Sequence, residues 1–104
     1  MLPKQKRLGS EGVKEVLAKG KSRRASSLSL KWLDTTGQFR CAVVVSKKLA
    51  KTAVKRNQLR RAVYQALKAS SLPRHGHAIL FVQSIPKDDL VGVFSTEIKK
   101  LLHV

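Results

Sequence analysis

The densest group of functional side chains is cationic and lies between Arg40 and Arg61, where eight Lys or Arg residues occur without one acid. Arginine offers a planar fork for bidentate phosphate contact, and the free N–H groups at the start of a helix also favour phosphate. Amide and phenol groups can contact ribose or base edges. The segment therefore predicts a folded RNA-binding surface made of Lys47, Lys48, Lys51, Lys55, Arg56, Asn57, Gln58, Arg60, Arg61 and Tyr64.

Catalytic chemistry by the chain itself finds little support. Nuclease metal sites need clustered carboxylates for Mg²⁺, but the six acids are scattered. The one adjacent pair, Asp88 and Asp89, is explained by a place at the start of a helix. His75 and His77 flank a glycine in a predicted loop without a partner ligand, and Cys41 lies in a strand predicted to be buried. No catalytic residue and no metal site on the protein is predicted.

The overall charge supports a polyanionic partner. The chain has 22 Lys and Arg against six Asp and Glu, which gives a formal net charge of +16. Seventeen of the cations lie in residues 1–61, and no acid occurs between Asp34 and Asp88. Nucleic acid is the usual partner of such a chain, because neutralised phosphates release condensed counterions. The alternatives are a basic surface kept for solubility and a membrane surface, but no basic amphipathic helix with aromatic anchors is found.

Length and composition predict one domain, an RNA-binding domain of residues 1–104. Apolar residues make up 42% of the 104, enough for a modest core, and no run approaches the roughly 20 apolar residues that span a bilayer. The first residues, MLPKQKRLGSEG, have no apolar core region, so no secretory signal is expected. The single cysteine fits a reducing cytosol, and a cytoplasmic location is expected.

The first half of the chain predicts one helix and two strands. Residues 10–19 are predicted to be a helix with Ser10 as N-cap and Gly20 as its stop. Residues 27–33 alternate, with Leu28, Leu30 and Trp32 on one side. Residues 34–37 carry a turn signal, and residues 39–46 form a second strand whose Ala-Val-Val-Val run indicates burial on both faces.

The second half predicts the main helix, a third strand and a last helix. Over residues 52–69 one side is apolar, formed by Leu59, Ala62, Val63, Ala66 and Leu67. The opposite side carries Asn57, Arg60, Arg61, Tyr64 and Lys68, with Arg56 at the edge of the two faces. A strand over 77–83 and a helix from about Lys87 to Leu102 follow, the latter with Asp88 and Asp89 in its first turn and Lys99 and Lys100 in its last.

These elements, in the order α-β-β-α-β-α with room for one extra short strand, predict an α+β fold, a two-layer α/β sandwich. The chain has few aromatic residues for its core or for base stacking. Trp32, Phe81 and Phe94 are expected in the core, although base stacking is an alternative for Trp32, and Phe39 is expected to begin a strand. For Tyr64 on the basic face, packing beside RNA sugar and simple surface filling are both open.

Together these features resemble the protein subunit of bacterial ribonuclease P. The Lys-Arg-Leu before the first helix and Lys-Gly-Lys-Ser at residues 19–22 resemble the start of that family. VVVSKK at 43–48 resembles its strand-to-turn signature, and AVKRNQLRR at 53–61 resembles its Arg-Asn-Arg helix motif. The single strand and last helix after Gly76 complete the pattern, which covers most of the chain.

The resemblance implies both a fold and a function. It implies that the main helix joins two parallel strands by a left-handed crossover. It implies a protein that binds ribonuclease P RNA, one protein per RNA, and helps it remove the 5′ leader of precursor tRNA by hydrolysis. The RNA would carry the catalysis and hold most of the Mg²⁺. Residues facing the RNA would be Arg56, Asn57, Arg60 and Arg61, and the leader would cross a cleft near Val13, Leu17 and Lys31.

The sequence departs from the family pattern at several of these places. Gln58 stands where the motif has its second Arg. Val13 and Leu17 stand where the first helix usually offers two Phe, Lys31 where the cleft usually has Tyr, and Gln83 where an Arg is common. Since stacking one base on an aromatic is worth ~1–3 kcal/mol, a cleft without these rings relies more on charge.

Two other readings remain open from the sequence. A ribosomal or ribosome-associated RNA-binding protein without a catalytic role fits the composition equally well. A module for double-stranded DNA would need an exposed recognition helix and usually a dimer, so DNA is not the expected partner.

Overall fold

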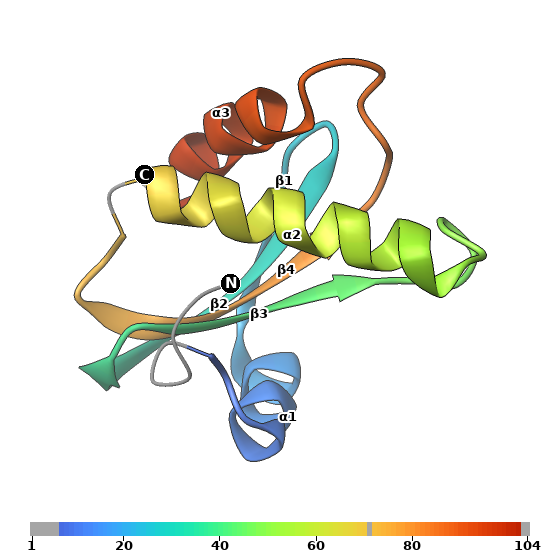
Figure 1. The fold of residues 1–104 in the computed structure, drawn as a ribbon. Coiled ribbons are helices and arrows are strands. Elements are labelled where there is room, and N and C mark those ends of the chain that lie inside the picture. The colour runs from blue at the N-terminus through green and yellow to red at the C-terminus, as the bar shows by residue number, and fades with distance from the viewer. Residues whose placement is uncertain (1–6, 71, 103–104) are drawn as a thin grey trace.

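The structure is a computed structural model that describes residues 7–70 and 72–102. Three helices and four strands follow one another along the chain (Figure 1): α1 (Ser10–Lys19), β1 (Lys21–Arg24), β2 (Leu28–Gln38), β3 (Arg40–Val45), α2 (Ala53–Ala69), β4 (His75–Val82) and α3 (Leu90–Leu102). The predicted α+β fold is confirmed, and β1 is its extra short strand. Lys6, which begins the Lys-Arg-Leu motif, lies outside the described residues.

The four strands form one mixed sheet in the order β1-β2-β4-β3. β2 is antiparallel to β1 and to β4, whereas β3 and β4 are parallel, with Cys41 opposite Ala78 and Val45 opposite Val82. The unit β3–α2–β4 therefore needs a crossover. In Figure 1 α2 lies above the sheet with β3 as the near edge, and the sense of the crossover is left-handed, as the resemblance implies.

The helix α2 forms where the sequence predicts it. The Thr52 hydroxyl accepts a hydrogen bond from the Lys55 backbone N–H at 3.1 Å, which caps the first turn. The predicted apolar side is buried in full: Leu59, Ala62, Val63, Ala66 and Leu67. This side packs on β3 and on α3.

The helices cover the two faces of the sheet unequally. α2 and α3 lie together over one face, where the main core contains Leu28, Leu80 and Phe94. α1 lies on the other face, where it contacts β2 and β4. Val16 and Ile79 are fully buried yet stand outside the main core cluster, so they form a small second core under α1. The rest of that second face stays open.

Two predictions about the sheet are wrong. Residues 34–37 are not a turn, because β2 continues to Gln38. β4 lies between β2 and β3, so the chain cannot pass from β2 to β3 in a tight hairpin. It instead crosses the beginning of β4, where the Phe39 N–H donates to the Arg74 carbonyl oxygen at 3.0 Å. Nor is β3 buried on both faces: it is an edge strand, and Val44 is 40% exposed.

Three other boundaries also differ from expectation. The N-cap of α1 is Gly9 rather than Ser10, and no side chain caps it. α3 begins at Leu90, so no acid lies in its first turn. Asp89 instead precedes the helix with a positive φ of 49°, and its Oδ1 accepts from the Gly92 backbone N–H at 3.2 Å. His75 lies inside β4 rather than in a loop.

Candidate nucleic-acid interface

The connection from β3 to α2 is a hydrogen-bonded loop that carries three of the predicted cations. The Ser46 hydroxyl accepts from the Leu49 backbone N–H at 3.2 Å. One guanidinium nitrogen of Arg56 donates to the Ala50 carbonyl oxygen at 3.0 Å and to the Lys51 carbonyl oxygen at 3.3 Å. Arg56 thus ties the loop to the helix, while the side chains that the loop leaves exposed are Lys47, Lys48 and Lys51.

The first half of α2 continues this basic surface. Lys55, Asn57, Gln58 and Arg61 are exposed, and Arg60 is half-buried. The Arg60 guanidinium donates to the Asn57 side-chain oxygen at 3.1 Å, one helical turn away. Within residues 7–70 and 72–102, no Lys or Arg forms an ion pair with Asp or Glu. The charges of this surface are therefore not neutralised within the described protein.

Tyr64 does not lie on the basic side of α2, so its predicted position is wrong. Only 8% of the residue is exposed, and it belongs to the main core. Burial, with a smaller contribution from Cys41, raises the pKa of the Tyr64 phenol above its ordinary value of 10.0, although Arg7 and Arg60 act in the opposite direction. The proposed RNA contact of Tyr64 has little accessible surface to act through.

The three residues of the predicted leader cleft lie between α1 and the open face of the sheet. The Lys31 ammonium donates to the Leu17 carbonyl oxygen at 3.3 Å, which joins β2 to the last turn of α1. Leu17 is 46% exposed, whereas Val13 is half-buried. The structure therefore brings Leu17 and Lys31 together, with the apolar Leu17 side chain open to solvent.

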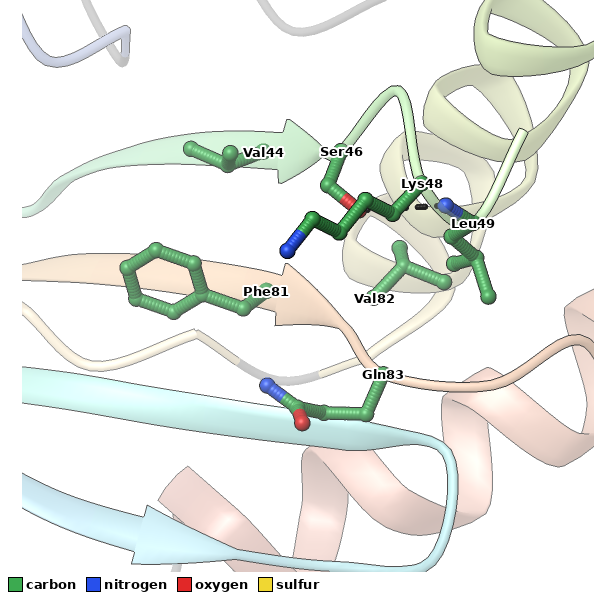
Figure 2. Close-up of a pocket in the computed structure, with 7 residues that line it drawn as sticks. All are labelled: Val44, Ser46, Lys48, Leu49, Phe81, Val82 and Gln83. Atoms are coloured by element: carbon green, nitrogen blue, oxygen red, sulfur yellow. Dashed lines mark hydrogen bonds between the residues drawn. The ribbon is translucent and has the colours of Figure 1, made fainter. Parts of the chain in front are cut away.

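Besides the leader cleft, the open face of the sheet has a pocket that α1 does not cover. The sequence did not predict this pocket. Figure 2 shows Val44 and Phe81 side by side on the sheet, with Lys48 reaching over them from the loop and Gln83 on the other side. The pocket holds about 310 Å³. Val44 is opposite Phe81 in the register of β3 and β4, and the Gln83 amide donates to the Ser29 hydroxyl at 3.0 Å. Lys48 thus connects the basic loop with the open sheet face.

Phe81 was expected in the core, and this expectation is wrong, because the ring is half-buried on the open face. The alternation of β4 contains the signal: Ala78, Leu80 and Val82 point to the main core, so Phe81 must point away from it. Trp32 is also half-buried rather than fully in the core; its ring stacks on Phe39 with 6.1 Å between centroids.

The remaining reactive side chains do not converge on a metal site. No group of three or more His, Cys, Asp or Glu able to hold a metal ion occurs among the described residues. Cys41 is fully buried in β3, which confirms its prediction as a small core residue. Likewise no helix in the described ranges is long and apolar enough to cross a membrane.

Comparison with known proteins gives a consistent picture. The family model described as Ribonuclease P matches residues 2–102. The fold is similar to that of the RNase P protein from Thermotoga maritima, with a TM-score of 0.80, 18% identity, and coverage of 94% of this chain and 96% of that one. It is also similar to the RNase P protein of Staphylococcus aureus, with a TM-score of 0.78, 23% identity, and coverage of 95% and 94%. A search of curated proteins found no match.

Proposed function

This chain belongs to the bacterial ribonuclease P protein family and is the protein component of that endoribonuclease, and we propose that it holds the RNA and the precursor tRNA while the RNA performs the chemistry. The observation that carries the proposal is the basic surface of the β3–α2 loop and α2, whose cations have no acidic partners in the described protein. Such a surface binds phosphate. Its proposed partner is ribonuclease P RNA, contacted by Lys47, Lys48, Lys51, Lys55, Arg56, Asn57, Gln58, Arg60 and Arg61, with one protein per RNA.

Mg²⁺, held mainly by the RNA, would supply the Lewis acid for phosphodiester hydrolysis. The acids of this chain support the proposal that the RNA rather than the protein holds the metal, because several of them already accept hydrogen bonds from backbone or indole N–H groups. The Glu97 carboxylate accepts from the Ser27 and Leu28 N–H groups at 2.6 and 3.0 Å. Asp34 accepts from the Trp32 indole at 2.7 Å, and Asp89 caps α3.

The proposed path of the precursor-tRNA leader is the open sheet face. It would pass Val13, Leu17 and Lys31 and reach the pocket of Phe81 and Val44. Phe81 offers the one aromatic ring of that pocket for base stacking, and Lys48 offers a cation for the adjoining phosphate. This order places the leader beside the RNA-binding loop. Since precursor tRNA is made in the cytoplasm, that is the proposed place of action.

The direct test is cleavage of precursor tRNA by the cognate ribonuclease P RNA at low Mg²⁺, with and without the purified protein. We expect the protein to stimulate cleavage and the variant Arg60→Ala/Arg61→Ala to need more protein for the same stimulation. The control is Lys87→Ala/Lys99→Ala, which removes the same charge from exposed positions outside α2. No stimulation at any ratio, together with retention on ribosomal RNA, would favour the structural RNA-binding protein instead.

A further inference from the structure

A second basic groove lies away from α2, between strand β1 and the last turns of α3. It consists of two adjoining pockets of about 370 and 480 Å³ that share Arg23 and Leu101. We call it the β1–α3 groove and define it by Lys21, Arg23, Arg24, Trp32, Lys100 and Leu101. Neither the Arg-Asn-Arg motif nor the leader cleft contributes a residue to it.

The sequence of β1, Lys-Ser-Arg-Arg, has no role in packing. All four residues are exposed, and the strand brings no apolar side chain to the core. The guanidinium of Arg23 lies 3.5 Å from the Leu101 carbonyl oxygen, where it holds the end of α3 against the sheet. The side chains of Lys21 and Lys100 make no hydrogen bond or ion pair in the described structure. Their charge is therefore available to a ligand.

The acids that line the groove do not neutralise these cations. Glu97 is 7% exposed and accepts two backbone hydrogen bonds from the β1–β2 turn. Asp34 accepts from the Trp32 indole N–H and so fixes the ring. The carboxylates nearest to these cations already accept hydrogen bonds from other groups, so the cations remain available to an anionic ligand in the groove.

One wall of the groove is apolar and contains the only tryptophan of the chain. The Trp32 ring rests on the backbone of Gly76 and stacks on Phe39, so its position is fixed from within the fold. Beside it, Leu101 and Leu102 complete an apolar surface next to Lys21. An aromatic ring beside a row of cations is the arrangement that binds single-stranded nucleic acid, with a base at the ring and phosphates along the cations.

The groove is separate from both RNA surfaces described above. β1 and β3 are opposite edges of the sheet, three strand spacings or ~14 Å apart. Lys21 and Arg23 lie opposite Trp32 and Leu30 in the register, so their side chains point to the α3 face. Lys31, in the leader cleft, points to the α1 face. A leader held in that cleft would have to turn around the sheet edge to reach this groove.

We propose that the β1–α3 groove binds an unpaired segment of ribonuclease P RNA, with phosphates on Lys21 and Lys100 and one base in the pocket beside Trp32. The inference rests on the proposed function, because it adds a second anchor for the same RNA. An unpaired segment fits better than a duplex, since α3 closes one side of the groove and a base must leave its stack to reach the ring.

The test uses the full-length protein, the cognate ribonuclease P RNA, and the variant Lys21→Ala/Lys100→Ala. Each lost single-strand phosphate contact lowers the slope of log affinity against log salt by about 0.7, so we expect a fall of roughly 1.4. The control Lys14→Ala/Lys87→Ala removes equal charge from exposed positions outside the groove and outside α2, and should change the slope less. Emission from Trp32 should change when wild type binds the RNA, and this change should shrink in the variant.

Three outcomes would overturn the inference. They are unchanged Trp32 emission on RNA binding, a slope change no larger than that of the control pair, or a Trp32 response to precursor tRNA alone that equals the response to ribonuclease P RNA. A strand edge can also use charge simply to prevent pairing with other chains. The variant Lys21→Glu/Arg24→Glu keeps that protection, so a variant that stays monomeric and binds the RNA with full affinity would assign β1 to edge protection. If wild type fails to bind the RNA at all, the proposed function itself is wrong.

Discussion

The Lys31 ammonium donates a hydrogen bond to the Leu17 carbonyl oxygen across 3.3 Å, and so a residue of the sheet closes the last turn of α1. The final carbonyls of a helix lack partners within the helix, and a cation there also suits the helix dipole. In the family pattern an aromatic residue stands at each of these two positions. Here a charge and an apolar side chain take their place, and the hydrogen bond between the two residues joins α1 to the sheet.

This arrangement predicts a gain of function at Leu17. Leu17→Phe should tighten binding of precursor tRNA with a single-stranded leader, because a partly exposed ring can stack on a base, with an upper limit of ~1–3 kcal/mol. The measurement is the ratio of affinities for precursor tRNA with a long leader and tRNA without one. Val54→Phe, at a position 69% exposed on α2, is the control and should leave the ratio unchanged. An equal ratio for both variants would remove Leu17 from the leader path.

Two arginines of α2 should separate into a structural and a binding role. Arg56 donates to two loop carbonyls, whereas the Arg61 side chain is exposed and makes no hydrogen bond in the described structure. Arg56→Ala should lower both RNA affinity and the free energy of unfolding, the latter by about 1 kcal/mol. Arg61→Ala should lower the salt slope of RNA binding by nearly one unit and leave stability unchanged. Chemical denaturation and binding at several salt concentrations measure the two effects, and identical stability losses would refute the division.

Tyr64 should make the protein less stable at alkaline pH. Its folded pKa is raised above 10.0, chiefly by burial, so the folded state favours the protonated phenol. The stabilisation is complete below about pH 10 and is lost as the pH rises from there through the folded pKa. Absorbance of the phenolate reports this single tyrosine directly. Tyr64→Phe is the matched control, and its denaturation midpoint should fall less than that of wild type between about pH 9 and about pH 11.

Gly76 should be intolerant of any side chain. Its φ is +114°, and an added Cβ would meet the Trp32 ring. Gly76→Ala should therefore cost at least about 1–3 kcal/mol from backbone strain and also shift the emission of Trp32. Gly37→Ala is the control, because a Cβ there meets nothing within 4 Å. Equal thermal midpoints for the two variants would show that the ring moves aside freely.

The parts of the fold that local chemistry decides could be predicted from the sequence. α2 is an example, since Thr52 and the apolar spacing from Leu59 to Leu67 act within one helix. Features that depend on strand order could not. Val44 is exposed because β3 is an edge, and residues 34–37 stay extended because β4 separates β2 from β3. β1 has no alternation of apolar and polar residues, so no sequence pattern predicted this strand.

The candidate site divides in the same way. Most cations of the loop and of α2 are exposed as predicted, because a charge run without acids has no partner to bury it, whereas Arg56 and Arg60 are half-buried. Tyr64 and Phe81 exchanged their expected places: the tyrosine is in the core, and the phenylalanine is at the surface pocket. Both errors arise because side-chain exposure depends on which neighbouring element covers each face. The position of α1, which covers only part of the second face, cannot be derived from spacing.

The strand order has a consequence for how the protein folds while it is being synthesised. β4 pairs with both β2 and β3 near the middle of the sheet, yet it is the last strand to be synthesised. Until His75–Val82 has left the ribosome, β2 lacks one neighbour and β3 has no partner within the sheet, so the sheet cannot close cotranslationally in stages. By then 19 of the 22 cations have already emerged. The nascent chain thus exposes its charge to the RNA-rich surface of the ribosome before it has a fold.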